Sequence, residues 1–256
     1  MTVYATYPSL AGTPVVISGG ASGIGESLVR NFAAQGAKVG FVDIAVDAGN
    51  ALVTELTSAG HTAKFIPCDV TDVPAYQAAI TGFAAAHGDA LVLVNNAAHD
   101  QRHDWSEVTP AYWDDRIAVN LKHQFFAIQA VAPGMIKAKR GSIINTGSIS
   151  WMVMTPRIPI YETAKAAIHG MTRAMARELG KSGIRVNTLA PGWVMTERQL
   201  THWLDAAGEK ALDEAQTLAG RVYPDDVARM ALFLAAEDSA MLSAQQFLVD
   251  GGWANV

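Results

Sequence analysis

Cysteine is almost absent from this chain of 256 residues, because Cys68 is the single one and no disulfide can form within the chain. That usage is typical of a reducing compartment, so we expect a cytoplasmic protein. The net charge of −5 is spread out and includes no basic tract, so we expect no nucleic-acid or membrane partner. No apolar run reaches the roughly 20 residues of a membrane span, and the start, Met1-Thr2-Val3-Tyr4, lacks the basic region and apolar stretch of a signal peptide.

Hydrophobic residues, by contrast, make up half of the chain, which is enough for a large core. Apolar runs typical of strands occupy residues 14–18, 38–43, 62–66, 90–94, 142–146, 185–189 and 246–249, with helical patterns between them. Because strands that alternate with helices form parallel sheets, we predict an α/β fold, a single doubly wound domain over residues 1–256 with a mainly parallel seven-stranded sheet. Ligands bind at the carboxyl ends of such strands, where Gly19, Asp43, Asp69, Asn96, Ser148 and Pro191 should meet.

A glycine-rich turn, S-G-G-A-S-G-I-G at residues 18–25, follows the first apolar run and precedes a helical pattern. Backbone N–H groups in such a turn can approach a pyrophosphate at the helix N-terminus. Asp43 ends the second strand pattern 18 residues beyond Gly25, where a carboxylate accepts hydrogen bonds from the ribose of NAD and repels the extra phosphate of NADP. Asp43 could instead cap the next helix, but strand order and spacing favour the cofactor role.

Tyr161 and Lys165 lie four residues apart in a helical pattern, and Ser148 follows a strand pattern upstream. A phenol normally loses its proton near pH 10, and an ammonium one helical turn away should lower that pKa. The Ser148 hydroxyl can hold the substrate oxygen whose proton moves. Tyrosine and lysine at this spacing also arise by chance as surface pairs, but the glycine turn and Asp43 favour an acid/base device.

These motifs resemble, in the same order and over nearly the whole chain, those of the short-chain dehydrogenase/reductase superfamily. The glycine turn has Ser18 in place of its threonine, and N-N-A-A at residues 95–98 has Ala98 in place of its final glycine. The resemblance implies a Rossmann-type fold, NAD as cofactor and a catalytic set of Asn120, Ser148, Tyr161 and Lys165. The cofactor contacts that it implies are Gly19, Ser22, Gly23, Ile24, Gly25, Asp43, Ile44, Asp69, Val70, Asn96, Ala97, Tyr161, Lys165, Pro191, Gly192, Val194 and Thr196.

The resemblance also assigns roles within the catalytic set. Lys165 lowers the Tyr161 pKa and holds the nicotinamide ribose, and Asn120 holds a water that passes the proton outward. Two long helices often pair between subunits in this family: one over residues 161–180, and one that follows Asp114, Asp115 and Arg116 and passes through Asn120, Phe125 and Val131. We therefore expect a homotetramer. Ala164, Ile168, Met171, Met175 and Leu179 recur at helical spacing and should form the buried stripe of the first helix.

Several segments are similar to the bacterial D-xylose (pentose) 1-dehydrogenases, among them Ser150-Trp151, Glu162-Thr163 and the chain end at residues 249–253. The similarity implies an NAD-dependent sugar dehydrogenase, which oxidises an aldose at C1 to the lactone. The aldose would be a pentose or 6-deoxyhexose such as D-xylose or L-arabinose. The expected substrate contacts are Ser148, Trp151, Arg157, Tyr161, Trp193, His99 and Arg102. The tryptophans could instead be packing residues, and Arg102 a solvated surface charge.

Arg157 leaves a second substrate open, because a guanidinium near the pocket suits a carboxylate such as that of a 2-keto-3-deoxy sugar acid. An outward-pointing charge is the alternative. His99, Asp100 and His103 lack a further ligand of suitable spacing, so we expect no metal. We predict that the amphipathic segment at about residues 193–220 forms a lid over the substrate. A non-catalytic NAD-binding regulatory protein is a third possibility, against which the presence of both Tyr161 and Lys165 argues.

Overall fold

The computed structural model describes residues 4–254, so Met1, Thr2 and Val3, on which the expected lack of a signal peptide partly depends, lie outside it. Seven parallel strands form one sheet in the order β3-β2-β1-β4-β5-β6-β7. The strands are β1 (Pro14–Ser18), β2 (Lys38–Asp43), β3 (Thr62–Pro67), β4 (Val92–Asn95), β5 (Gly141–Thr146), β6 (Ile184–Pro191) and β7 (Gln246–Val249). The predicted doubly wound, single-domain α/β fold is therefore confirmed.

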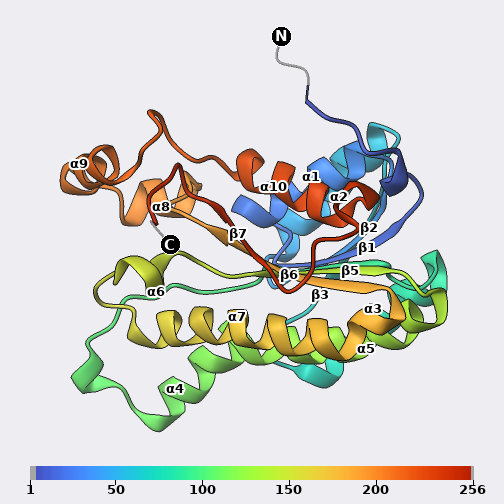
Figure 1. Ribbon diagram of the computed structural model, residues 1–256, viewed down its shortest axis with the longest axis horizontal. Helices are drawn as coiled ribbons and strands as arrows, with labels where there is room; N and C mark the ends of the chain where they lie inside the picture. The colour runs from blue at the N-terminus through green and yellow to red at the C-terminus, as the bar shows by residue number, and fades with distance from the viewer. Residues whose placement is uncertain (1–3, 255–256) are drawn as a thin grey trace.

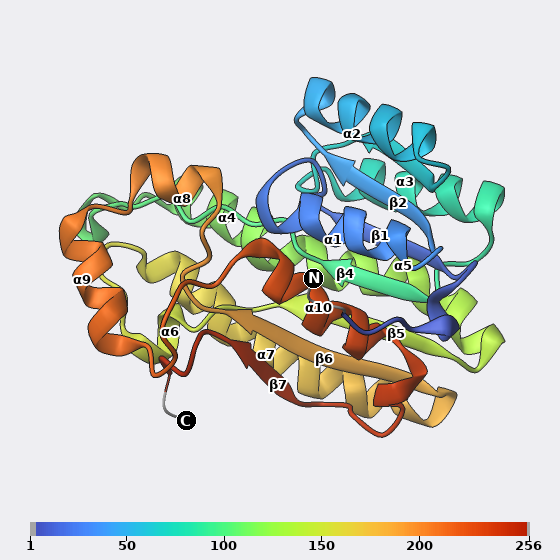
Figure 2. The same cartoon turned by 90° about the horizontal axis from the view of Figure 1, so that it is seen from above.

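Helices cover both faces of the sheet (Figure 1). One layer holds α1 (Gly23–Ala34), α2 (Val46–Ser58) and α10 (Pro224–Ala235), and the opposite layer holds α3 (Val73–His87), α5 (His123–Ala138) and α7 (Pro159–Leu179). The shorter helices are α4 (Pro110–Ile117), α6 (Ser150–Val153), α8 (Glu197–His202) and α9 (Ala206–Ala215). Seen from above, α8 and α9 lie beyond the carboxyl ends of the strands (Figure 2). Short 3-10 turns occur at Pro8–Leu10, Trp105–Glu107, Gly180–Ser182 and Glu237–Ser239.

The central strands are apolar along their whole length because a helical layer covers each face. Val15 and Ile17 of β1 pack into the core beneath α1 and α10, whereas Val16 between them packs into the core beneath α3 and α5. This alternation is the normal consequence of strand geometry. Four strands differ in extent from the prediction: β3 and β5 are each one residue longer, β4 begins at Val92, and β6 continues to Pro191, which pairs with β7. The longer β6 brings its carboxyl end to the edge where ligands bind.

The helix that was expected to follow Asp114, Asp115 and Arg116 starts earlier than predicted, and these three residues lie inside α4. The start of α4 is fixed by the Thr109 hydroxyl, which accepts a hydrogen bond from the backbone N–H of Tyr112. A π-helical segment, Ala118–Lys122, then joins α4 to α5 and contains Asn120. The expected single helix is therefore two helices with a bulge between them.

Helix α7, predicted over residues 161–180, spans Pro159–Leu179. Of the stripe that was expected to be buried, Ala164, Ile168 and Leu179 are buried, while Met171 and Met175 are only half-buried. The buried face also includes Lys165, so this helix carries a charged group into the interior. None of the helices between residues 4 and 254 combines the length and apolar character that a membrane crossing requires.

Candidate active site

A cleft of about 1330 Å³ opens at the carboxyl ends of the strands, beneath α8. Most of the predicted site residues line it: Gly19, Ser22, Gly23, Ile24, Gly25, Asp43, Ile44, Asp69, Val70, Asn96, Ala97, His99, Arg102, Ser148, Tyr161, Lys165, Pro191, Gly192, Trp193, Val194 and Thr196. Asn120, Trp151 and Arg157 are not among the lining residues. The cleft includes the boundary between β1 and β4, where the strand order reverses and α/β sheets bind their ligands.

At Gly19 and Gly25 the turn between β1 and α1 has no room for a side chain. A Cβ on Gly25 would lie 1.7 Å from the carbonyl oxygen of Gly19, and Gly19 itself has φ +68°. The Asn96 amide donates to the carbonyl oxygens of Ser18 and Gly19, both at 3.0 Å, which holds the turn against the loop after β4. The backbone is thus exposed to the cleft at the N-terminus of α1. That arrangement fits the pyrophosphate of a dinucleotide.

Asp43 lies at the end of β2, as predicted, and its carboxylate accepts hydrogen bonds from the N–H groups of Ala21 (2.9 Å) and Ala45 (3.0 Å). It is not the N-cap of α2, since that position belongs to Ala45. Arg30 lines the same end of the cleft and was missed by the sequence analysis. Its guanidinium binds the carboxylates of Glu26 and Glu55.

Tyr161 and Lys165 come from the first turns of α7, and Ser148 from the loop after β5. The Lys165 ammonium donates to the backbone carbonyl of Thr146 at 2.8 Å and lies 5.3 Å from the centroid of the Tyr161 ring. A hydrogen bond from Ser148 to Tyr161 favours the phenolate. The predicted trio is therefore brought together at one end of the cleft.

The electrostatics of this pair differ from the expectation. Burial raises the pKa of Tyr161 above its ordinary value, and the charge of Asp100 adds to the rise. Burial also lowers the pKa of Lys165 to about 7, against the opposing effect of Asp100. The expected lowering of the Tyr161 pKa is thus wrong for the protein alone, because loss of solvation outweighs the hydrogen bond with Ser148.

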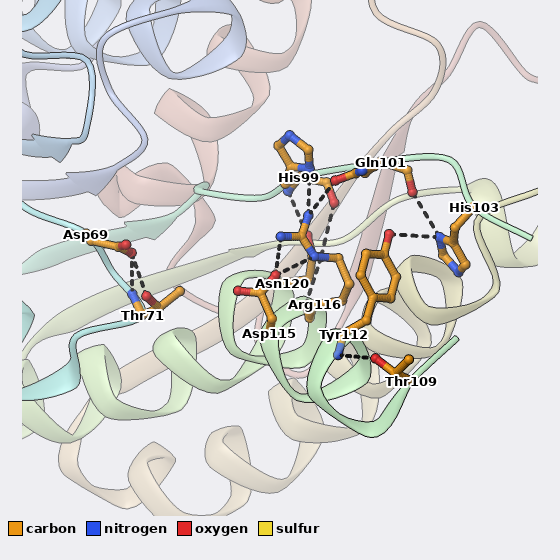
Figure 3. Close-up of polar contacts among 10 residues, drawn as sticks. All are labelled: Asp69, Thr71, His99, Gln101, His103, Thr109, Tyr112, Asp115, Arg116 and Asn120. Carbon is orange, nitrogen blue, oxygen red and sulfur yellow. Dashed lines mark hydrogen bonds and ion pairs between the residues drawn. The ribbon is translucent and has the colours of Figure 1, made fainter. Parts of the chain in front are cut away.

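Asn120 is fully buried in the π-helical segment, and all of its polar contacts are to backbone (Figure 3). Its amide nitrogen donates to the carbonyl oxygens of Arg116 (2.9 Å) and His99 (3.1 Å), and its oxygen accepts from the His99 N–H at 2.8 Å. Both N–H bonds are used, so Asn120 fastens the loop after β4 to this helix. That it holds a water remains a prediction.

Of four residues that were expected to contact substrate, two line the cleft and two do not. Trp193 and Arg102 line the cleft, and the Arg102 guanidinium lies 4.7 Å from the centroid of the Trp203 ring. Trp151, half-buried in α6, does not line the cleft, and this placement argues against the predicted contact. The same holds for Arg157, which is exposed and does not line the cleft; its backbone has φ +69°, and its carbonyl accepts a hydrogen bond from the His103 N–H at 2.8 Å.

His99 lines the cleft in a defined tautomer. Its Nδ1 lies 2.8 Å from the Arg116 guanidinium, which can only donate, so Nδ1 accepts and Nε2 carries the proton. Burial, followed by the charges of Arg198 and Arg116, lowers the pKa of His99, which keeps the ring neutral at pH 7. Between residues 4 and 254, no group of three or more His, Cys, Asp or Glu side chains is arranged to hold a metal ion.

Asp100 and Gln199 also line the cleft and were not predicted as site residues. The Gln199 amide donates to the Asp100 carboxylate at 2.8 Å and accepts from the Trp193 indole N–H at 2.9 Å. Arg198 donates to the same carboxylate at 3.2 Å. The two sides of the cleft mouth are therefore joined by polar contacts, from residues too far apart in sequence to form a motif.

A phenol, a hydroxyl and an ammonium at one end of a cleft whose other end is a bare glycine turn can pass a proton beside a bound dinucleotide. The turn fits such a cofactor because its backbone lies open and a Cβ on Gly25 would fill the space. When bound, the nicotinamide supplies the hydride acceptor. The protein supplies the proton acceptor, the group that orients the substrate oxygen and the walls.

Comparison with known proteins identifies the family. A family model described as enoyl-(acyl carrier protein) reductase matches residues 19–254. The D-xylose 1-dehydrogenase of Caulobacter vibrioides is 48% identical over 97% of this chain and 98% of its own. The probable galactose dehydrogenase of Rhizobium meliloti is 43% identical, with 96% of each chain covered. The structure of a gluconate 5-dehydrogenase from Burkholderia cenocepacia, in complex with NADP and tartrate, is 31% identical at a TM-score of 0.89, covering 96% of this chain and 97% of that one. The chain belongs to the short-chain dehydrogenase/reductase family and is an oxidoreductase that acts on CH–OH groups.

Proposed function

We propose that the protein is an NAD-dependent sugar dehydrogenase that oxidises an aldose at C1 to the lactone. A pentose or 6-deoxyhexose such as D-xylose or L-arabinose is the expected substrate. The convergence of Ser148, Tyr161 and Lys165 in a cleft with an open glycine turn carries the proposal. The likeness to the xylose and galactose enzymes supports the choice of an aldose.

In the proposed reaction the cyclic sugar loses a proton from its C1 hydroxyl and a hydride from C1, and the C1–O bond becomes the lactone carbonyl. Tyr161 accepts the proton as phenolate, and the Ser148 hydroxyl holds the same oxygen. NAD, which the glycine turn and Asp43 would hold, would supply the acceptor for this hydride. Lys165 fixes the geometry through its bond to the Thr146 carbonyl, and in its charged form it favours the phenolate.

The preference for NAD over NADP rests on Asp43 and Arg30. The Asp43 carboxylate would repel a phosphate on the ribose. Arg30, the nearby guanidinium, is held by Glu26 and Glu55, which offset its charge. A related enzyme binds NADP, so the choice of cofactor is part of the proposal.

A 2-keto-3-deoxy sugar acid is the alternative substrate, oxidised at a secondary alcohol. Arg157 was the main reason to consider a sugar acid. Because Arg157 is exposed and does not line the cleft, it no longer supports that substrate. The non-catalytic regulatory protein is disfavoured because the catalytic trio is complete in one cleft. We also propose the homotetramer and a lid at residues 193–220, which contains α8 and α9. The cytoplasmic location stays a prediction from the lone cysteine.

The test is a comparison of initial rates with a panel of aldoses and a panel of deoxy-keto sugar acids, each with NAD and with NADP. The proposal expects kcat/KM at least about tenfold higher for one aldose with NAD than for any sugar acid or for NADP. The product of the reaction should be the lactone, which mass spectrometry identifies. A preference for a sugar acid would overturn the substrate assignment and keep the dehydrogenase.

A further inference from the structure

Asp100 lines the same cleft as Tyr161 and Lys165, and the proposed proton transfer does not use its carboxylate. Asp100 lies on the loop after β4 and lines the cleft. Tyr161 and Lys165 line the same cleft, and the charge of Asp100 raises the pKa of each of them. Asp43 already serves the opposite end of the cleft. A second carboxylate, close to where the substrate must bind, therefore needs its own explanation.

Contacts from α8 fix the position of this carboxylate. Arg198 donates to its Oδ1 at 3.2 Å, and the Gln199 amide donates to its Oδ2 at 2.8 Å. The indole N–H of Trp193 can only donate and a carboxylate can only accept, so the Gln199 amide between them has one allowed orientation. A carboxylate has about four acceptor positions, and these contacts use two of them. No other hydrogen bond to this carboxylate occurs within residues 4–254, which leaves acceptor positions for hydroxyl groups.

A hydrogen-bond donor lies next to this acceptor in the chain. The Nε2–H of neutral His99 points away from Arg116, to which the other ring nitrogen is bound (Figure 3). No other hydrogen bond to the His99 ring occurs within residues 4–254. A sugar hydroxyl both donates and accepts, so an acceptor and a donor in adjacent residues match a polyol.

Trp193 adds a flat apolar wall to the same end of the cleft. Helix α9 backs the indole closely, because a Cβ on Gly208 would lie 2.9 Å from the ring atom Cη2. The indole N–H is bound to Gln199, so the ring is tied to the group that holds Asp100. An aromatic wall beside a few fixed polar groups is the usual composition of a small-molecule site.

We propose that Asp100 is the specificity-determining residue of this enzyme, which accepts hydrogen bonds from one or two ring hydroxyls of the aldose. Gln199 and Arg198 hold the carboxylate, His99 donates to a hydroxyl oxygen, and Trp193 covers the face of the sugar ring. The inference rests on the proposed function and deepens it.

The first test compares Asp100→Asn with the wild type on D-xylose. The replacement keeps the size of the side chain and removes its charge and one acceptor oxygen. We expect kcat/KM for D-xylose to fall about tenfold or more, because hydrogen bonds to a charged acceptor are the strong ones. The Kd for NAD should stay within about twofold, since the cofactor binds elsewhere. Asp238→Asn is the matched control, because Asp238 is exposed and does not line the cleft, and that variant should keep the wild-type kcat/KM.

The second test separates substrate recognition from a purely structural tie between the loop and α8. The 2-, 3- and 4-deoxy analogues of D-xylose are assayed with both proteins. If Asp100 binds a hydroxyl, the analogue that lacks it loses kcat/KM in the wild type but loses about tenfold less in Asp100→Asn. An equal loss for every analogue in both proteins would overturn the inference, as would a weakened Kd for NAD together with a uniform loss on all sugars. Failure of the wild type to oxidise any aldose would instead overturn the proposed function, so that measurement comes first.

Discussion

At the scale of single residues, Tyr161 carries the greatest weight in the proposed chemistry. Tyr161→Phe keeps the buried ring and removes the hydroxyl that accepts the proton. We expect turnover to fall at least about a hundredfold, as for the loss of a general base, while NAD binding survives. Steady-state kinetics and a fluorescence titration with NAD measure the two effects. Unchanged turnover in this variant would refute the assignment of the base.

The lowered pKa of Lys165 predicts that the stability of the protein without cofactor depends on pH. Burial lowers its pKa to about 7, whereas the unfolded chain has the ordinary value near 10.4. Between these values the unfolded state binds more protons, so this residue makes stability fall as the pH is lowered from about 10 to about 7. Lys165→Met cannot titrate, so its melting temperature should exceed that of the wild type by about 5 °C or more at pH 7.

That difference should shrink steadily as the pH rises toward 9.5, and it should level off below pH 7. Calorimetry of both proteins across this range is the measurement. A melting-temperature difference that is the same at all pH values would show that burial does not disfavour the charged form of Lys165. The comparison uses the free protein because a bound dinucleotide would add its own stabilisation.

At the scale of an element, the turn between β1 and α1 has almost no tolerance for a larger residue at Gly25. A Cβ there would lie 1.7 Å from a backbone oxygen, so Gly25→Ala must displace the turn. We expect NAD binding to be lost and the melting temperature to fall. Gly82→Ala in α3 is the control, since nothing lies within 4 Å of its added Cβ.

Alanine favours a helix over glycine by about 1 kcal/mol, so Gly82→Ala should leave NAD binding unchanged and raise stability slightly. Titration with NAD and thermal melts of both variants test the pair. Retention of NAD binding by Gly25→Ala would mean that the turn does not hold the cofactor as proposed.

Elements were predictable where a local rule sets them. The strands show in the sequence as continuous apolar runs because both faces are covered, and the glycine turn follows from the space that it must leave open. The start of α4 could have been found from Thr109-Pro110, since threonine caps helices and proline suits the first turn. The π-helical segment around Asn120 has no comparable signature, because it arises from contacts to His99 that only the folded chain brings together.

The same distinction applies to the site. Tyr161, Lys165 and the cofactor residues follow from motifs in which spacing alone places the groups. Asp100 and Gln199 could not be predicted, because their contact joins residues 99 positions apart across the cleft mouth. The direction of the Tyr161 pKa was missed for a related reason. Sequence spacing reveals the neighbouring Lys165 but not the depth of burial, which is the largest cause of the raised pKa of Tyr161.

At the scale of the whole molecule, the proposed homotetramer predicts a solution mass about four times the 27.2 kDa of the chain. Phe125 and Ile136 are apolar side chains of α5 that remain partly exposed, at 43% and 45%. Phe125→Glu should lower the mass measured by light scattering if this helix pairs between subunits. Ser58→Glu, at the exposed end of α2, is the control and should leave the mass unchanged. A monomeric wild type would contradict the proposal.

The order of the strands has a consequence for the synthesis of the protein. β1 pairs with β4, so Val15 finds its partner Val92 only after much of the chain has left the ribosome. β7 is made last and covers the edge of β6, whose final residue Pro191 lines the cleft. A translation product that stops before Gln246 leaves that edge free to pair with other chains. Prematurely terminated copies should therefore aggregate or be degraded rather than persist as partly working enzyme.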